Sequence, residues 1–332
     1  MKSNTTLPSY AVVDGWEQLP AGWSHADVCD VSTDADDRVY VLNRGEHPVI
    51  VYARDGTFAG SWGEGEFVNP HGITIGPDGA AYCVDNGDHT VRKYTLEGEL
   101  LLTLGVPGTP SSTGYDGDYR SVQRGGEPFH RPTKVCVLSS GTFYVSDGYG
   151  NARIHRYAAD GTLETSWGEP GEGPGQFRIP HGVTATPDEQ RLLVSDRENN
   201  RVQVFDLDGG LLDEWRDLSR PNGVAISSDG LVFVAELGAR AALFPSMPRP
   251  TERTPGSRCS ILDLDGRLLG RLGSEGDPCA AGSFYAAHGV CVDSRDDLYV
   301  GEVTWSAGGK RGEVPETCHT LQKLRRTTAD EH

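Results

Sequence analysis

The stretch PHGITIGPDGAAYCVDNGDHTVRKYTLEG, residues 70–98, contains the unit from which most of the chain is built. It opens with a short apolar segment, turns at a PDG, and runs through a second apolar segment that ends in an acidic residue. A third segment follows and leads into an EG turn. Short, largely apolar runs bounded by such turns are typical of antiparallel strands joined by hairpins. The unit therefore predicts a small sheet of consecutive strands.

The same unit recurs six times along the 332 residues, which predicts an all-β, six-bladed β-propeller in a single domain. The blades are expected at approximately 26–63, 68–105, 130–168, 178–215, 219–273 and 285–326. The segment YAVVDGWEQLP at 10–20 resembles an outermost strand, and the sixth unit ends early. We therefore expect the N-terminal strand to complete the last blade and to close the ring, which removes open sheet edges.

The composition narrows the class of partner. The formal net charge is −18, and a surface this acidic repels phosphate backbones and anionic lipid, so we expect neither nucleic-acid nor membrane binding. The sequence contains no apolar run approaching ~18 residues and no basic segment followed by an apolar one at the N-terminus. A cytoplasmic location is expected.

The seven cysteines are scattered and lack C-x-x-C spacing, so we expect reduced thiols, in line with a reducing compartment. Cys29, Cys83 and Cys291 lie in predicted apolar strands, where buried, inert thiols are expected.

Alignment of the six units on their first strands places a histidine in every second unit. The aligned residues are Asp27, His71, Thr133, His181, Asn222 and His288. The first strand of each propeller blade lines the central channel, and alternate members of a six-fold ring are related by three-fold rotation. Three imidazoles can therefore converge on the axis, and a His₃ set with an open fourth position is a known catalytic zinc arrangement. We predict a Zn²⁺ site at His71, His181 and His288. The other histidines are expected at the surface or in loops: His25, His47, His89, His130, His155, His319 and His332.

The ends of the second strands are expected on the same face as this histidine column, and there the chain departs from its repeat. Arg44 stands in LNRGEH, Tyr149 in SDGYGN and Arg197 in SDRENN. An arginine beside a metal orients carboxylate or carbonyl oxygens, and a tyrosine there suits a general base. The pattern alone leaves open that all three are exposed loop residues.

At these residues the chain resembles peptidyl-α-hydroxyglycine α-amidating lyase, the lyase domain of peptidylglycine amidation, within the wider NHL-repeat propellers. The similarity extends over roughly 26–326. The stretches that carry it are VLNRGEH, PHGITI, YVSDGYGNARI, IPHGVTA, LLVSDRENNRVQVF and AAHGVCV. The resemblance implies Zn²⁺ on the three histidines, Tyr149 as the base, and Arg44 and Arg197 on the substrate's oxygens. The implied reaction cleaves the C–N bond of a carbinolamide to an amide and an aldehyde such as glyoxylate, without a redox cofactor.

Two departures from the family matter. Gly150 stands where the secreted family has a disulfide-bonded cysteine, and Gly289 stands where it has an aspartate used for a structural calcium. Asp27, with main-chain carbonyls near Val28 and Ile73, is a substitute oxygen set for Ca²⁺.

We also expect a small or medium anionic, carbinolamide-type substrate, because no oxidase domain accompanies the chain to supply hydroxyglycine peptides. Two insertions, 106–129 and 238–258, read as loops over one face that narrow its entrance. They carry Tyr115, Tyr119, Arg120 and Arg124 in the first and Arg240, Arg249 and Arg253 in the second.

Two other classes stay open. One is a non-catalytic NHL propeller that binds a protein or peptide. The other is a calcium-dependent lactonase-like hydrolase, because PNGVAISSDG at 221–230 resembles a stretch of gluconolactonases. Metal content separates the three: zinc favours the lyase, calcium the lactonase, and no metal the scaffold.

Overall fold

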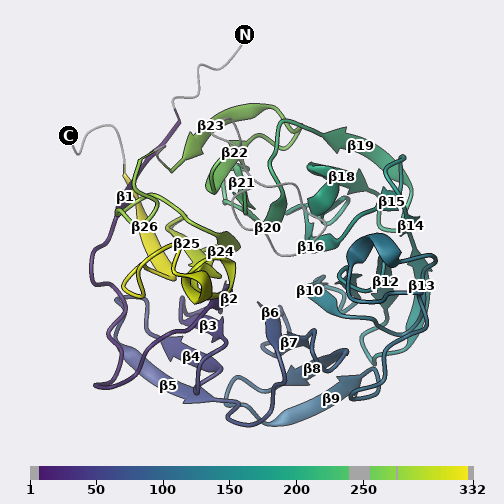
Figure 1. The fold of residues 1–332 in the computed structure, drawn as a ribbon, viewed down its shortest axis with the longest axis horizontal. Coiled ribbons are helices and arrows are strands. Elements are labelled where there is room, and N and C mark those ends of the chain that lie inside the picture. Colours follow the sequence, from purple (N-terminus) through teal and green to yellow (C-terminus); the bar gives the residue numbers. More distant parts are fainter. Residues whose placement is uncertain (1–6, 239–254, 274–275, 328–332) are drawn as a thin grey trace.

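The computed structural model describes residues 7–238, 255–273 and 276–327. Six four-stranded antiparallel sheets surround a central axis, which confirms the predicted six-bladed propeller (Figure 1). The strands of each blade are given from the axis outward. The first blade has β2 (Val28–Thr33), β3 (Val39–Asn43), β4 (Val49–Tyr52) and β5 (Phe58–Trp62); the second has β6 (Pro70–Ile75), β7 (Ala81–Asp85), β8 (Thr90–Tyr94) and β9 (Leu100–Leu104); and the third has β10 (Pro132–Val137), β11 (Phe143–Asp147), β12 (Arg153–Tyr157) and β13 (Leu163–Trp167). The fourth blade has β16 (Pro180–Ala185), β17 (Leu192–Asp196), β18 (Arg201–Phe205) and β19 (Leu211–Trp215); the fifth has β20 (Pro221–Ile226), β21 (Val232–Glu236), β22 (Arg258–Leu262) and β23 (Leu268–Leu272); and the sixth has β24 (Ala287–Val292), β25 (Leu298–Glu302), β26 (Leu321–Thr327) and β1 (Ser9–Val12).

The remaining elements are short and lie in the connections. They are the parallel pair β14 (Glu169–Pro170) and β15 (Gln176–Phe177), the 3₁₀ turns η1 (Tyr119–Ser121), η2 (Arg197–Asn199) and η3 (Gly309–Arg311), and the helix α1 (Thr304–Ala307). Within the described residues, no helix is long and apolar enough to span a membrane.

The blades pack on one another through large side chains of the middle strands. Between the second and third blades, the rings of Tyr82 and Phe143 lie 5.5 Å apart, and Phe143 stacks on Tyr157 at 5.2 Å. All three are buried. Burying one such side chain contributes roughly 1.5–3 kcal/mol to stability, so the alternating apolar pattern holds neighbouring sheets face to face.

A tryptophan at the end of a blade packs against a turn glycine of the next blade. A Cβ on Gly209 would lie 2.7 Å from the ring of Trp167, and one on Gly266 would lie 2.2 Å from the ring of Trp215. Both glycines also have positive φ, 91° and 77°, so this turn requires glycine twice over. The W-G and D-G elements of the repeat therefore come together between neighbouring blades.

The N-terminal strand closes the ring, as predicted. β1 pairs antiparallel with β26, with Ser9 opposite Thr327 and Val12 opposite Leu324. The strand itself covers residues 9–12, shorter than the predicted segment 10–20. Its continuation carries Trp16, which packs in the same cluster as Tyr52 and Tyr299 of the first and last blades.

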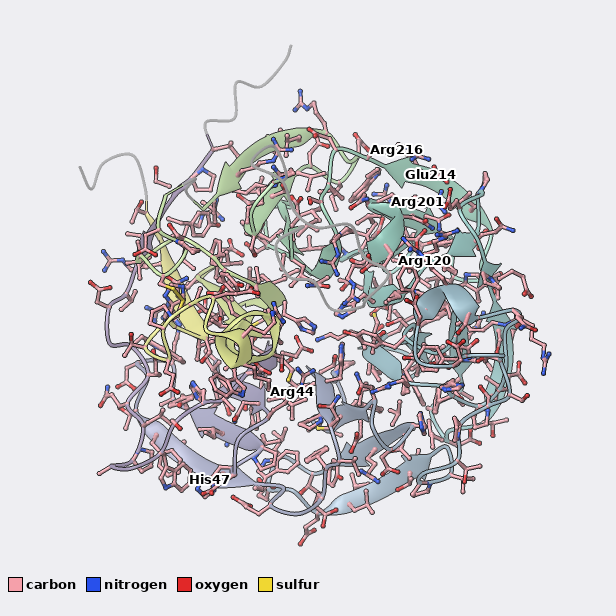
Figure 2. All side chains as sticks on the ribbon, in the orientation of Figure 1. Arg44, His47, Arg120, Arg201, Glu214 and Arg216 are labelled. Atoms are coloured by element: carbon pink, nitrogen blue, oxygen red, sulfur yellow. A yellow bond between two sulfur atoms is a disulfide. The ribbon has the colours of Figure 1, made fainter. Side chains whose placement is uncertain are left out.

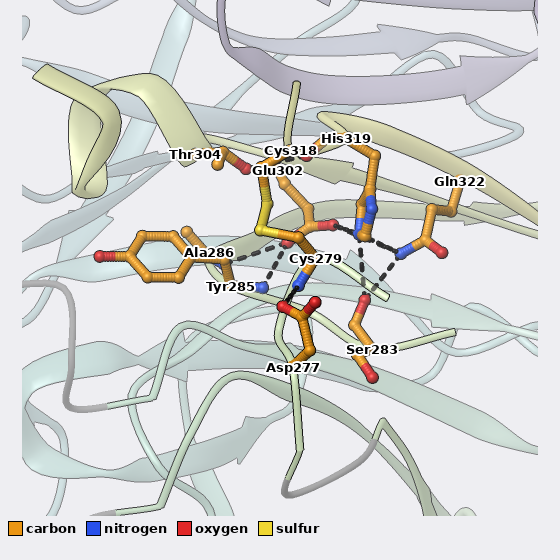
Figure 3. Close-up of a disulfide and its surroundings, with 10 residues drawn as sticks. All are labelled: Asp277, Cys279, Ser283, Tyr285, Ala286, Glu302, Thr304, Cys318, His319 and Gln322. Carbon is orange, nitrogen blue, oxygen red and sulfur yellow. Dashed lines mark hydrogen bonds and ion pairs between the residues drawn. A yellow bond between two sulfur atoms is a disulfide. The ribbon is translucent and has the colours of Figure 1, made fainter. Parts of the chain in front are cut away.

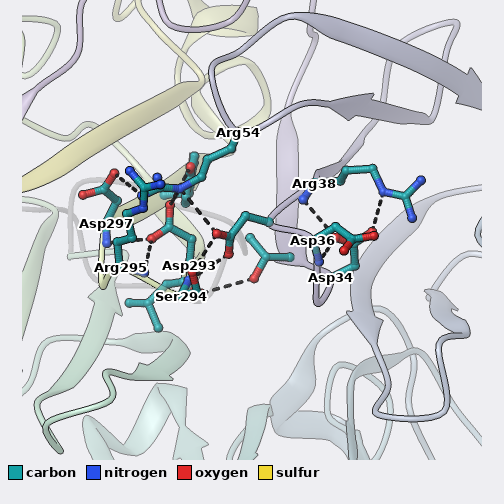
Figure 4. A network of polar contacts seen from close by, with 12 residues as sticks. Asp34, Asp36, Arg38, Arg54, Asp293, Ser294, Arg295 and Asp297 are labelled. Atoms are coloured by element: carbon teal, nitrogen blue, oxygen red, sulfur yellow. Dashed lines mark hydrogen bonds and ion pairs between the residues drawn. The ribbon is translucent and has the colours of Figure 1, made fainter.

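An ion-pair network also joins the first and last blades. The Nε of Arg54, after β4, donates to Asp293 at 2.9 Å, and its Nη2 donates to Asp297 at 3.2 Å, both in the turn between β24 and β25 (Figure 4). Because both carboxylates are largely buried, this network fixes the closing interface more firmly than an exposed ion pair would.

The expectation that all cysteines are reduced was wrong. Cys279 and Cys318 form a disulfide with a Cα–Cα distance of 5.0 Å, between the loop before β24 and the segment before β26 (Figure 3). The repeat pattern does not cover these loops, so the sequence alignment did not bring the two residues together. The other five are free thiols. Of the three predicted to be buried and inert, Cys29 and Cys83 are buried and Cys291 is half-buried, and burial raises the pKa of Cys29 to about 12.

Candidate metal centre

A bulge at the start of each innermost strand turns one side chain toward the axis. In β6, Pro70 pairs with Asp85 and Gly72 with Val84, so His71 is left between them without a pairing partner. His181 and His288 occupy the same place in β16 and β24. β-Bulges re-aim side chains in this way and are frequent next to functional sites.

The structure brings the three histidines together. His71, His181 and His288 are all buried, and their ring centroids lie 4.6–4.9 Å apart. One potential ligand atom from each lies within 4.8 Å of the other two. Among the described residues, this is the group of three His, Cys, Asp or Glu side chains able to hold a metal ion.

Neighbouring blades orient two of the imidazoles. The Nδ1 of His71 lies 2.8 Å from the carbonyl oxygen of Thr133, and the Nδ1 of His288 lies 2.6 Å from that of Cys29. Because a carbonyl oxygen only accepts, Nδ1 carries the proton and Nε2 keeps its lone pair for a metal. Burial lowers the pKa of His288 to about 3 and those of His71 and His181 well below the usual value. All three are therefore neutral at physiological pH, the form that binds metal.

The first-blade member of this column is Cys29, and its assignment to Asp27 was wrong. Val28 pairs with Asn43 and Asp30 with Leu42, so Cys29 occupies the bulge. Asp27 lies two residues earlier, where its carboxylate accepts from the Ser306 backbone N–H at 2.9 Å and contacts the Ser306 hydroxyl. The interval of 14 residues from Cys29 to Asn43 matches that in four of the other five blades, and this spacing could have identified Cys29.

Tyr149 lies directly over two of the histidines. Its hydroxyl oxygen is 3.2 Å from Nε2 of His71 and 3.2 Å from Nε2 of His181. Nη1 of Arg197 donates to the same oxygen at 3.1 Å, and the guanidinium carbon lies 5.0 Å from the phenol ring centroid. Tyr149 follows β11, so the second-strand ends do share a face with the histidine column.

Arg197, in η2, is fully buried, and two of its three guanidinium nitrogens have hydrogen-bond partners among the described residues. Its Nε donates to Glu198 at 2.8 Å, and Glu198 also accepts from Nη2 of Arg220 at 3.0 Å. Nη2 of Arg197 is buried without a hydrogen-bond partner among the residues that the structure describes. A buried N–H without a partner is costly, and here it leaves a donor for a ligand oxygen. The sequence did not single out Glu198 or Arg220, because neither breaks the repeat in a recognisable motif.

Arg44 follows β3 and lies close to the axis (Figure 2). Its contacts are long: Nη1 is 3.3 Å from the Asp27 carboxylate, and Nε is 3.4 Å from the Pro70 carbonyl oxygen. Asp27 thus positions Arg44, and Ser306 in α1 positions Asp27. None of the three predicted polar residues is an exposed loop residue, since Tyr149 and Arg44 are no more than half-exposed and Arg197 is buried.

The predicted calcium ligands do not assemble into an oxygen cage. The Asp27 carboxylate is used by Ser306 and Arg44, and the Ile73 carbonyl oxygen accepts from Nζ of Lys134 at 2.8 Å. Val28 lies in β2, where it pairs with Asn43. Ca²⁺ takes 6–8 oxygen ligands, and these groups do not supply them.

Two of the histidines expected at the surface or in loops are buried, although only His155 lies outside a loop. His155 in β12 is fully buried, with Nδ1 2.8 Å from the Ser166 hydroxyl. His130 packs against Gly150, where a Cβ would lie 2.2 Å from its Cδ2. His130 thus fills the space that a side chain at 150 would need. His332 lies outside the described residues.

The first insertion, 106–129, folds back through η1 over the third blade (Figure 1). The ring of Tyr115 lies 5.1 Å from that of His130, and Nε of Arg120 lies 3.1 Å from the Tyr119 hydroxyl. Arg124 donates to Ser112 at 3.0 Å. Arg240, Arg249 and Arg253 of the second insertion lie outside the described residues.

Comparison with known proteins supports the resemblance to NHL-repeat propellers. A family model described as "NHL repeat" matches residues 129–157 and 177–205. NHL repeat-containing protein 3 of Homo sapiens is 31% identical over 244 residues, covering 69% of this chain and 67% of that protein. Peptidyl-alpha-hydroxyglycine alpha-amidating lyase 1 of Drosophila melanogaster is 37% identical over 155 residues, covering 43% of this chain but only 26% of the lyase.

Solved structures agree on the fold alone. A streptogramin B lyase superimposes with a TM-score of 0.58 at 13% identity, covering 96% of this chain and 98% of its own. A gluconolactonase from Xanthomonas campestris gives 0.58 at 15% identity, covering 91% and 88%.

The repeat, the ring and the histidine centre define an NHL-repeat β-propeller. Within that class, the chain belongs to the family that includes NHL repeat-containing protein 3, and it is similar to the amidating lyases.

Proposed function

We propose that this protein is a zinc-dependent lyase that cleaves the C–N bond of a carbinolamide, giving an amide and an aldehyde such as glyoxylate. The observation that carries the proposal is the Tyr149 hydroxyl, which lies 3.2 Å from two of three convergent histidine nitrogens and accepts from Arg197 at 3.1 Å. The proposed base, two of the proposed metal ligands and the Arg197 cation thus lie within hydrogen-bond distance of one atom, the Tyr149 hydroxyl oxygen.

The residues present fit Zn²⁺. Three neutral imidazoles are a preferred zinc donor set with an open fourth position, and Zn–N distances are about 2.0–2.1 Å. Tetrahedral Zn–N bonds of this length set the nitrogens about 3.4 Å apart, so donor atoms within 4.8 Å of one another would approach by up to about 1.4 Å around such an ion. When bound, Zn²⁺ would act as a Lewis acid on the substrate's hydroxyl oxygen and make its proton easier to remove.

The chain's own residues then move one proton. With Tyr149 as phenolate, its oxygen accepts the proton from the carbinolamide hydroxyl while the C=O bond forms and the C–N bond breaks. The same proton passes from Tyr149 to the departing nitrogen. The amide and the aldehyde therefore leave without any net uptake or release of protons. Arg197 holds the Tyr149 oxygen in place during both transfers.

Two guanidinium groups bind the substrate's other oxygens. The unpartnered Nη2 of Arg197 is suited to a carbonyl or carboxylate oxygen, and Arg44, held only by long contacts, is suited to a second. Two buried or half-buried cations favour an anionic substrate even though the whole chain has a net charge of −18.

Elemental analysis of the purified protein, followed by an assay of glyoxylate release from α-hydroxyhippurate, tests the proposal. We expect about one zinc per chain and release that stops when a chelator removes the metal. Calcium in place of zinc would favour a lactonase-like hydrolase instead. A metal-free protein without lyase activity would favour a binding propeller, a role that similarity to NHL repeat-containing protein 3 leaves open.

A small substrate is expected to be preferred over a long peptide. The first insertion contacts the loop that carries Tyr149, since the Thr113 hydroxyl donates to the Gly150 carbonyl oxygen at 2.6 Å, and we infer that it limits the space for a long substrate there. The measurement compares kcat/KM for α-hydroxyhippurate with that for a peptide ending in α-hydroxyglycine after several residues. We expect the smaller substrate to be at least as good. A tenfold peptide preference, about 1.4 kcal/mol of added transition-state binding, would contradict this substrate class.

A further inference from the structure

The layer directly beneath the histidines is nearly free of side chains. The residues that follow the six column positions are Asp30, Gly72, Lys134, Gly182, Gly223 and Gly289. A Cβ on Gly72 would lie 2.5 Å from the Thr133 carbonyl oxygen, and one on Gly182 would lie 2.4 Å from that of Asn222. The blades therefore meet at backbone distance, and only Asp30 and Lys134 project side chains from this layer.

Those two side chains form an ion pair across the channel. Nζ of Lys134, in the third blade, contacts Oδ2 of Asp30 in the first. The same Nζ donates to the Ile73 carbonyl oxygen of the second blade at 2.8 Å, and the Ile73 N–H donates to Asp30 at 2.8 Å. One ammonium group thus ties three blades together at the axis.

The Asp30 side of the pair is buried, whereas the Lys134 side chain is 19% exposed and also lines a channel cavity of about 380 Å³. Asp30 is only 3% exposed, and the cavity between this layer and the three histidines measures about 20 Å³, room for about one water molecule. A hydrated divalent cation does not fit in the space between the ammonium group and the histidines.

Gly289 explains why the carboxylate comes from the first blade. A Cβ at 289 would lie 2.5 Å from Cα of Asp30 and 2.7 Å from its Oδ1. Asp30 therefore occupies the space that a side chain of the sixth blade would need. Both charges of the pair are supplied by the chain itself.

We infer that the Lys134 ammonium is a built-in cation that replaces a structural metal at the centre of the propeller, so that the fold does not require calcium. An ammonium group has three donors, and at least two of them are used here on Asp30 and Ile73. This inference concerns the layer below the histidines and does not rest on the proposed lyase function.

Thermal unfolding of the purified protein tests it. The Tm of the native chain in a calcium chelator and in millimolar CaCl₂ should agree within about 1 °C, because no site gains a ligand. Lys134→Met should lower the Tm by on the order of 5 °C, because it leaves the Asp30 carboxylate buried and unpaired. The double variant Asp30→Asn/Lys134→Met should recover much of that loss, as expected for two coupled groups.

Lys93→Met is the matched control. Lys93 pairs with Asp78 at 2.7 Å, but the Asp78 side chain is 33% exposed against 5% for Asp30, so removal of Lys93 should change the Tm little. The inference is overturned if calcium raises the native Tm by several degrees, or if Lys134→Met is as stable as the native chain. Should Lys134→Met not accumulate as folded protein, calcium titration of the native chain by calorimetry decides: no binding supports the inference, and one tight site overturns it.

Discussion

Replacement of Tyr149 by Phe is expected to lower kcat by about 10²–10⁴-fold, the usual contribution of a positioned acid–base group. The ring still fits beneath Arg197, whose guanidinium carbon lies 5.0 Å from its centroid, so the pocket keeps its shape. What is lost is the oxygen that lies 3.2 Å from His71 and His181. Zinc content should not change, because the three imidazoles are untouched.

The measurement is kcat and KM on α-hydroxyhippurate, with zinc determined on the same preparation. Tyr144→Phe is the matched control. The Tyr144 hydroxyl donates to the Leu207 carbonyl oxygen at 2.9 Å, between the third and fourth blades, so its loss should cost stability of about 1 kcal/mol and leave kcat unchanged. A Tyr149→Phe enzyme of near-native rate would remove Tyr149 from the reaction.

Replacement of His181 by Ala is expected to abolish stoichiometric zinc and to lower kcat/KM by about 10³-fold or more. Lewis-acid stabilisation by a metal is worth several kcal/mol, and each 1.4 kcal/mol is a factor of ten. The fold should persist, because His181 lies at the axis and not in the apolar clusters between blades.

Circular dichroism and elemental analysis of the variant separate loss of metal from loss of fold. His47→Ala is the control, since His47 is partly exposed and pairs with Glu64 at 2.8 Å, away from the centre (Figure 2). A His181→Ala protein that keeps one zinc per chain and native turnover would contradict the proposed centre.

The propeller could be predicted from the sequence because its information is local and repeated. Each blade shows short apolar runs and a turn glycine, and the third strands add a period of two, as in Val202 and Val204. The histidine centre followed from spacing, because equivalent positions of a ring must meet. The alignment was wrong in the first blade. The segment ADVCDV has an aspartate, Asp27, two residues before Cys29, which is the residue that occupies the column.

The rest depends on contacts that no repeat encodes, some in the loops beside a single blade and one between blades. The Cys279–Cys318 disulfide joins two loops that have no counterpart in the other blades. His130 and Gly150 are neighbours only because the third blade brings the end of β11 beside the strand β10. The Lys134–Asp30 pair joins the third blade to the first, and these two blades are not consecutive. Such pairs are visible only once the ring is assembled.

The pairing of β1 with β26 also fixes when the site can exist. The sheet that holds His288 needs both Ser9–Val12, which precedes all the other strands in the chain, and Leu321–Thr327, which follows them. A nascent chain can therefore stack its first blades on the ribosome, but the ring stays open until its last strand emerges. Contacts between residues so distant in sequence form slowly. His71 and His181 must accordingly wait for His288, so the proposed metal centre is complete only after β24 has joined the ring.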